Sequence, residues 1–421
     1  MALRWKYLRD LCAFAASLLS PFAHSYVSPL PLPKGVRALA YVYGYASDVD
    51  SNINSEGLLE DLAGPLNRSV SLEELAKSEP DLLRLQNILQ DLDPAWVDQV
   101  LAVNLYSDVS VFESRKVTGF MFGLTDRFSA GFVLPYIKRD LSFSFDANIV
   151  NNAGAIASSV GNIPDLQEGL QRLKDYPLNT QTFTQAIFLD RGYNAPRSSS
   201  IGVWGDLEVE TRYSYYFDTD WCLGFRGGFR APTSSYEPDI RNLLERDLTE
   251  NTWAIKASHL SEYQIVPYRL SWSTLVGTTV RLPKQQTRAY ALTSNEVLPD
   301  LRDPRQIETV SKTIGPEINA ETGLQASFFG GVLNLMGSYF YTQKAEDFIE
   351  GARGLDYARE TNNTAAMSHG MELALELSTF AAYQRNSFFI PFKISTAYVR
   401  PLAGRNTVFA PYWRLDSVLL F

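Results

Sequence analysis

Charged side chains recur on one face of a predicted hairpin, and they are the groups in this chain best placed to do chemistry. Glu208, Glu210 and Arg212 alternate with apolar residues, and Arg226 and Arg230 follow on a second alternating segment. Successive residues of a β-strand point to opposite faces, so these side chains share one face of the hairpin. Opposite charges that meet across a strand ladder form ion pairs. We therefore predict a cluster of carboxylates and guanidinium groups that forms ion pairs or lines a polar path.

Residue types that build catalytic or metal sites are scarce. We expect His259 and His369 at strand ends near the surface. Ser368 and His369 are adjacent in a predicted strand, so they face opposite sides and cannot form a nucleophile–base pair. Residues 48–56 resemble the start of a calcium loop, but Ile53 stands where that loop needs glycine. We expect no enzyme activity, no cofactor and no metal site, with calcium binding at 48–56 left open.

The strands that carry the charged face are long and amphipathic. Their other face is apolar and aromatic, with Tyr213, Tyr215 and Phe217 before the turn and Trp221 after it. Strands in soluble sandwiches average about five or six residues, whereas aromatic-flanked strands of about ten residues are typical of transmembrane barrels. Similar segments recur along the chain. We predict an all-β protein: a transmembrane antiparallel up-and-down β-barrel of about 12 strands, with a helical extracellular loop after strand 1.

The connections between the predicted strands alternate between tight turns and long polar loops. Outer-membrane barrels have this asymmetry, with short periplasmic turns and long extracellular loops. An even number of strands puts both chain ends on the periplasmic side. Within 128–145 the apolar residues change parity near Lys138, which predicts a β-bulge or an early strand end. Tight turns are predicted at Thr125, Asp218, Pro267, Gly330 and Arg385.

The chain divides into a leader and a barrel. Residues 1–25 have the basic start, apolar stretch and small-residue exit of a cleaved secretory signal peptide, and residues 26–421 form the barrel. The acidic segment 48–108 is predicted to be a helical extracellular insertion, and 146–199 a long extracellular loop. The terminal Phe421 is in phase with the apolar face of the last strand. It resembles the membrane-assembly signal of bacterial outer-membrane proteins.

The inward face of the predicted barrel carries acids and bases in equal numbers. A wide ion-selective pore would show one dominant sign at its constriction. Twelve strands lie between barrels that side chains fill and barrels that enclose a water channel. The charges therefore cross a narrow lumen as ion pairs or line a polar path, and both interpretations stay open. We predict that the lumen or its constriction is lined by Glu208, Glu210, Arg212, Arg226, Arg230, Arg269, Arg281, Glu317, Glu321, Glu372 and Glu376.

Two motifs resemble a known family. Residues 122–136, FGLTDRFSAGFVLPY, resemble its "YGLTDRLxLGxxxPY" hairpin, and residues 201–213, IGVWGDLEVETRY, resemble its "GxGDxxLGxxY" strand. The family is that of the outer-membrane proteins of phenol degradation (the MetA pathway), distantly similar to the fatty-acid and aromatic-hydrocarbon transporters. The resemblance implies a 12-stranded barrel that passes hydrophobic or aromatic compounds. The fatty-acid transporters carry an N-terminal plug, whereas only residues 26–35 precede strand one here, so we expect the helices of 48–108 to lie outside as a lid.

These patterns predict an outer-membrane channel or transporter for passive uptake of small, hydrophobic or aromatic solutes. The alternative is a closed structural or binding barrel that presents acidic loops to a partner or to lipopolysaccharide. The expected location is the outer membrane of a Gram-negative bacterium, reached by secretion through the inner membrane. The expected partners are outer-membrane lipid, lipopolysaccharide, the barrel-assembly machinery and small solutes. The net charge of −9 disfavours nucleic acid.

Overall fold

The computed structural model describes residues 29–421, apart from 65–66, 73–79, 160–162, 176–178, 182–183, 185–187, 246 and 293–298. The predicted signal peptide, residues 1–25, lies outside the described residues. Across the described ranges, no helix is long and apolar enough to cross a bilayer. Long antiparallel strands dominate the fold, as the alternating sequence predicts.

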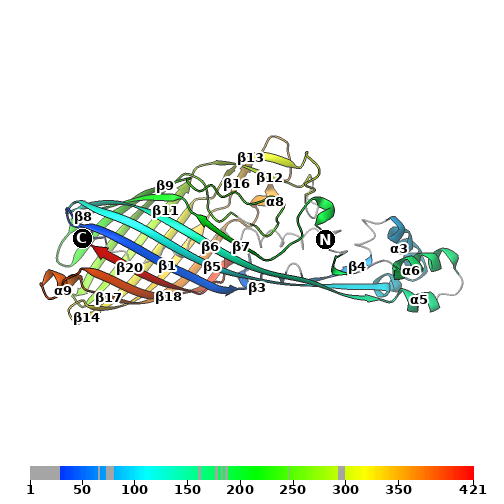
Figure 1. Cartoon of the computed structure of the whole chain (residues 1–421), viewed down its shortest axis with the longest axis horizontal. Coiled ribbons are helices and arrows are strands. Elements are labelled where there is room, and N and C mark those ends of the chain that lie inside the picture. The colour runs from blue at the N-terminus through cyan, green and yellow to red at the C-terminus, as the bar shows by residue number, and fades with distance from the viewer. Residues whose placement is uncertain are drawn as a thin grey trace.

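Twelve strands close into one antiparallel barrel within the described part of the chain (Figure 1). The last strand, β20, pairs with β1 and closes the ring, which confirms the predicted architecture. A shorter strand, β7 (Ser199–Trp204), pairs with β6 beyond the start of β8. In barrel order the strands are β1 (Arg37–Val49), β5 (Leu101–Thr125), β6 (Phe128–Asn151), β8 (Leu207–Phe217), β9 (Trp221–Ala231), β10 (Ala254–Val266), β11 (Leu270–Arg281), β14 (Glu317–Phe328), β15 (Leu333–Lys344), β17 (Ala366–Ser378), β18 (Phe392–Arg405) and β20 (Tyr412–Leu420).

The two faces of the barrel wall differ in chemistry. On β9, Phe225 and Phe229 point outward and are 54% and 45% exposed, whereas Cys222 and Gly224 face inward and are buried. Exposed Trp, Tyr, Phe and Leu side chains continue around the outer wall. A continuous apolar surface of this size is stable against lipid, not against water. The outer wall therefore suits a bilayer.

The ends of the barrel differ as the connections predict. At the turn end, the links at 126–127, 218–220, 267–269 and 329–332 are tight turns, and the chain also ends there (Figure 1). The predicted tight turn at Arg385 is wrong: β17 stops at Ser378, and the helix α9 (Phe380–Gln384) intervenes before β18. At the opposite, loop end lie two small sheets: β12 (Lys284–Ala289), β13 (Ile307–Thr313) and β16 (Phe348–Glu350) with the helix α8 (Ala358–Thr361), and β2 (Ser51–Ile53), β3 (Leu59–Asp61) and β19 (Thr407–Val408).

Strands β5 and β6 have 25 and 24 residues, about twice the length of their neighbours. The bulge predicted near Lys138 is wrong, because β6 keeps one register with β5 through Lys138, which pairs with Ser114. The change of parity has another cause. Within the barrel one face of β6 meets the polar lumen with Arg139, and farther along the same face packs Phe145 and Ile149 against buried leucines. The strand keeps its register, while the groups around this face change from the polar lumen to the apolar core of buried leucines.

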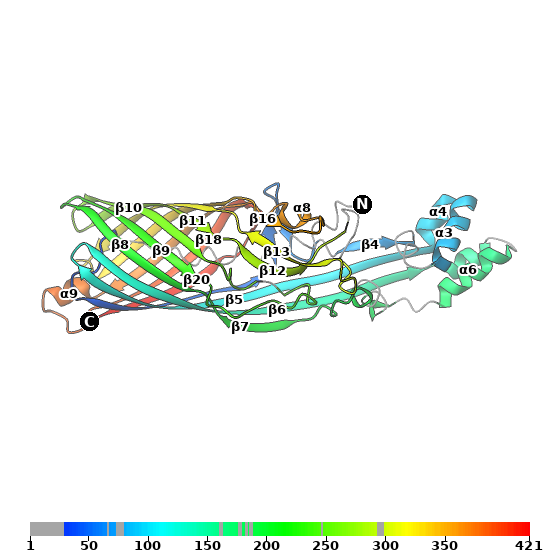
Figure 2. The same cartoon turned by 90° about the horizontal axis from the view of Figure 1, so that it is seen from above.

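A helical head sits at the far end of these two strands, opposite the C-terminus (Figures 1 and 2). Its buried core includes Leu85, Leu89, Leu166 and Leu170, spaced at helical intervals of three or four residues. The head consists of β4 (Arg68–Ser71), α3 (Pro80–Leu92), α4 (Pro94–Val100), α5 (Ala153–Ser159), α6 (Pro164–Asp175) and the ends of β5 and β6.

The two predicted insertions both contain the expected helices but also strand. The segment 48–108 includes β2, β3 and β4 besides α3 and α4, and from Leu101 onward it is already β5. The segment 146–199 begins with the end of β6, then holds α5, α6 and the short helix η3 (Leu189–Arg191). The two insertions therefore form one head together instead of two separate loops.

Candidate functional site

The hairpin of β8 and β9 brings its five predicted charges together. Glu208 lies directly opposite Arg230 in the ladder, and their side chains are 2.9 Å apart. Glu210 lies opposite Gly228, so its carboxylate reaches diagonally to Arg226 at 2.6 Å and along its own strand to Arg212 at 3.0 Å. All five face the lumen, because alternate residues of each strand point inward.

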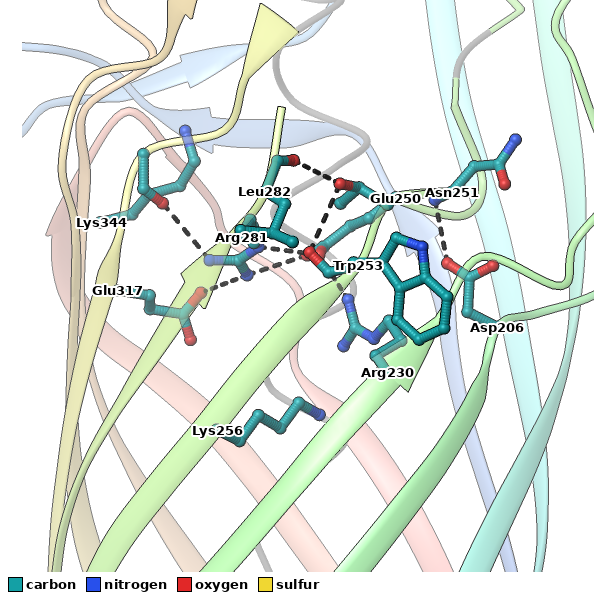
Figure 3. Close-up of polar contacts among 12 residues, drawn as sticks. Asp206, Arg230, Glu250, Asn251, Trp253, Lys256, Arg281, Leu282, Glu317 and Lys344 are labelled. Atoms are coloured by element: carbon teal, nitrogen blue, oxygen red, sulfur yellow. Dashed lines mark hydrogen bonds and ion pairs between the residues drawn. The ribbon is translucent and has the colours of Figure 1, made fainter. Parts of the chain in front are cut away.

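A residue that the sequence reasoning missed, Glu250, joins this cluster from the loop between β9 and β10. Figure 3 shows its carboxylate between the guanidinium groups of Arg230 and Arg281, and it is ion-paired with both. Arg281 donates two hydrogen bonds to it, at 2.7 and 2.8 Å, and pairs with Glu317 at 3.0 Å. A two-pronged guanidinium–carboxylate contact of this kind is both strong and directional. Glu250 thus connects β9 to β11 and β14.

Other polar contacts hold the same loop against the loop end of this side of the barrel. The buried carboxylate of Asp206 accepts backbone N–H bonds from Ser234 at 3.1 Å and Asn251 at 2.9 Å. Lys284 donates to the backbone carbonyl of Glu250 at 2.8 Å. Burial alone would raise the pKa of Glu250, but the charges of Arg230 and Arg281 outweigh it and lower this pKa to about 2. Glu250 is therefore an anion near neutral pH, and we call it and its two arginines the loop latch.

The predicted residues Glu372 and Glu376 belong to a second cluster on the other side of the barrel. Arg414 lies between Glu372, at 2.7 Å, and Asp416, at 3.0 Å. Glu376 pairs with Lys393 at 2.9 Å and also accepts a hydrogen bond from Asn334. These residues come from β15, β17, β18 and β20.

Two more predicted lumen residues are Arg269 and Glu321. Arg269 is exposed in the turn between β10 and β11, so its placement in the lumen is wrong. The physical reason is that β10 ends at Val266 and β11 begins at Leu270, which puts Arg269 outside the alternating ladder. Glu321 does face inward from β14, in electrostatic reach of Arg226.

Part of the inner wall is apolar. Met336, Ala374 and Ala397 pack together on β15, β17 and β18. Near the loop end, Phe340 and Val399 belong to a second apolar group, which also buries Leu62 and Ala63 of the connection after β3. The lumen is therefore lined by charged residues on β8 to β14 and by apolar residues, interrupted by the second ion cluster, on β15 to β20.

The segment before β1 lies in the turn-end mouth of the barrel. Pro29 is buried, and a Cβ added to the inward-facing Gly224 would lie 3.1 Å from its carbonyl oxygen. A Cβ at Gly123, which also faces inward, would lie 1.9 Å from the carbonyl oxygen of Pro33. Glycine at both positions leaves room for the segment. Although no large plug was expected, residues 29–33 narrow this mouth.

The two histidines in the described part of the chain lie on different strands, apart from each other. His259 lies in the middle of β10 instead of at its end, faces outward and is hydrogen-bonded to Tyr215 at 2.8 Å. His369 is near the start of β17 and contacts Tyr339. Among the described residues, no group of three or more His, Cys, Asp and Glu side chains is arranged to hold a metal ion. In the segment 48–56, the Asn54 amide oxygen accepts backbone bonds within the turn after β2.

No family model matches the sequence, and no curated protein matches it. Among solved structures, the chain is similar to the COG4313 outer membrane channel from Pseudomonas putida F1, with 12% identity, a TM-score of 0.53, and coverage of 94% of this chain and 100% of that one. The toluene transporter TodX of P. putida matches at 10% identity, 92% and 90% coverage, and a TM-score of 0.33, too low to support an argument. The first likeness shows that the chain has the fold of an outer-membrane channel barrel, which agrees with the fold implied by the sequence motifs.

Proposed function

We propose that this protein is an outer-membrane channel for passive uptake of small, hydrophobic or aromatic solutes. The observation that carries the proposal is the loop latch. The carboxylate that joins Arg230 to Arg281 comes from a connecting loop and not from the barrel wall. A barrel with a purely structural lumen needs only strand residues to neutralise one another. A loop that is held at the rim of the barrel by ion pairs can be released from it and open a path.

The apolar inner wall supports the choice of solute. Met336, Phe340 and Val399 are buried in apolar packing on the inner wall, and a hydrocarbon or aromatic ring that displaced part of this packing would lose contact with water favourably. The charged wall on β8 to β14 keeps the rest of the lumen polar. This division fits a solute with little charge of its own, and it agrees with the family that the two sequence motifs resemble.

The outer wall and the chain end support the proposed location and partners. Phe421 exchanges two backbone hydrogen bonds with Arg37 and presents an exposed aromatic ring at the turn end. We propose that the barrel-assembly machinery recognises this end and that the barrel then lies in outer-membrane lipid and lipopolysaccharide. The turn end faces the periplasm in this arrangement. Cell fractionation, with boiled and unboiled samples compared on gels, tests it, and recovery as a soluble protein would contradict it.

The transport test compares the wild type with Glu250→Gln. The glutamine keeps the size of the side chain but removes the charge that binds Arg230 and Arg281, so the loop should be released more often. Liposomes containing the variant should take up a neutral monoaromatic compound faster than liposomes containing the wild type. Glu376→Gln is the matched control, because it removes a buried lumen carboxylate that holds no loop. If neither protein passes ions or aromatics, the barrel is closed and structural.

A further inference from the structure

The most exposed aromatic side chains of the described chain are grouped at one part of the turn end. Tyr268 is 89% exposed, Phe329 80% and Phe389 78%. They lie in the connections β10–β11, β14–β15 and β17–β18. These six strands are consecutive neighbours in the barrel, so the three connections lie side by side along one half of the rim.

The hairpins themselves do not account for these rings. Tyr268 has a φ of 60° and Phe329 a φ of 53°. This left-handed region suits glycine or asparagine and is unfavourable for a bulky residue. Both side chains are nearly fully exposed, so contacts within this chain do not compensate for the unfavourable backbone. The physical explanation that remains is a favourable interaction of these two rings with something outside the chain.

The other half of the rim has different chemistry. The β5–β6 turn contains Asp126 and the β8–β9 turn contains Asp218 and Asp220. The Asp218 carboxylate accepts the backbone N–H of Thr219 at 2.7 Å, and that of Asp126 accepts the N–H of Lys34 at 3.1 Å. These are ordinary water-exposed polar turns. The turn tips on this side are thus polar, although exposed Leu124 and Phe217 flank them, whereas the turn tips on the other side carry the three most exposed aromatic rings.

The arginines near the aromatic turns and the position of these turns beside the outer wall indicate which partner binds this side of the rim. Exposed Arg269 and Arg385 lie in two of the three connections, where they can reach phosphate groups. The patch is continuous with the lipid-facing outer wall through the exposed Ile265, Phe328 and Ile390. Aromatic rings and arginine guanidinium groups together favour the boundary between lipid headgroups and acyl chains.

We propose that this half of the rim, residues 265–269, 328–329 and 385–390, is a phospholipid-binding surface. The rings enter the boundary layer of the bilayer, and the two arginines bind lipid phosphates. The acidic turns on the other half stand in water. The barrel axis is therefore tilted, with the aromatic side seated deeper in the membrane. This proposal needs a membrane-embedded barrel but does not depend on transport.

Site-directed spin labelling tests how deeply this half of the rim lies in the membrane. The background is Cys222→Ser, which removes the sole cysteine of the described residues. Tyr268→Cys, Phe329→Cys and Phe389→Cys are labelled one at a time, and Thr219→Cys is the control on the acidic side. The proteins are placed in vesicles of phosphatidylethanolamine and phosphatidylglycerol, after gel mobility has shown that each is folded. Collision rates with oxygen and with a water-soluble nickel complex then report depth.

We expect the oxygen-to-nickel collision ratio at the three aromatic positions to exceed the ratio at position 219 several-fold. Equal, water-like ratios at all four positions would overturn the proposal and leave a periplasmic protein as the occupant of the patch. A second variant pair, Arg269→Gln with Arg385→Gln, should move the label at position 329 toward water. An unchanged ratio in that pair would overturn the assignment of phosphate binding to the arginines.

Discussion

Removing the two arginines of β9 perturbs the charged cluster at its centre. Arg230 pairs with Glu208 and Glu250, and Arg226 pairs with Glu210. The double variant Arg226→Ala with Arg230→Ala leaves these three carboxylates with fewer cations. We expect two effects from this one change: a less stable barrel and a lumen that favours cations.

The size of the stability loss depends on the ion pairs that remain after both arginines are removed. Breaking a buried ion pair by removing one partner costs about 3–5 kcal/mol. Lys256 still pairs with Glu208, and Arg281 still pairs with Glu250. Arg212 likewise keeps its contact with Glu210. Because every carboxylate retains one cation, we expect the lower end of that range, about 3 kcal/mol, for the double variant.

Two measurements check this prediction. Urea titration, read by the mobility of the unboiled barrel on gels, gives the loss of stability. Planar bilayers under a salt gradient give the selectivity, and the reversal potential of the variant should shift toward that of potassium. Arg305→Ala is the control, because it removes a water-exposed cation that pairs with Asp303 in a loop outside this cluster. If the variant conducts with an unchanged reversal potential, the cluster does not face the conducting path and our reasoning is refuted.

Three further predictions concern the ends of the barrel. The pKa of Glu250 is lowered from 4.5 to about 2, so its stabilisation of the loop is complete above about pH 4.5 and is lost as the pH falls toward 2. Protease protection of the 232–253 loop should therefore stay constant from about pH 8 to about pH 5, and a loss within that range would contradict the latch. Deleting residues 29–33 should raise conductance without unfolding the barrel, because the segment lies in the turn-end mouth; an unchanged conductance would place the constriction elsewhere. External trypsin on intact cells should cleave at the exposed Arg84 of the head and spare the exposed Arg127 of the β5–β6 turn, whereas cleavage at Arg84 only after permeabilisation would invert the topology.

The strands and the first cluster could be predicted because a period of two determines which face a residue occupies. The positions of Glu208, Glu210 and Arg226 could be predicted from their odd or even place in the strand and from the position of a tight turn. The same rule placed Glu372 and Glu376 inside the barrel, but it could not show that they form a separate cluster. That depends on which strands are neighbours across the lumen.

The remaining features have no periodic signal. Glu250 lies in a loop whose path is determined by Arg230, Arg281 and Asp206, which are distant in sequence. The extension of β5 and β6 was hidden because the apolar face changes sides where the strand leaves the bilayer region. Arg269 shows the converse error, since parity has no meaning for a residue within a turn.

Conductance and solute uptake of the wild type and of Glu250→Gln, side by side in the same lipid, test the central claim most directly. We expect a narrow wild-type channel and a variant with higher conductance and faster influx of a neutral monoaromatic compound, with Glu376→Gln close to the wild type. Equal conductance and influx in all three proteins would contradict the loop latch. The absence of both conductance and influx in all three would contradict the channel itself.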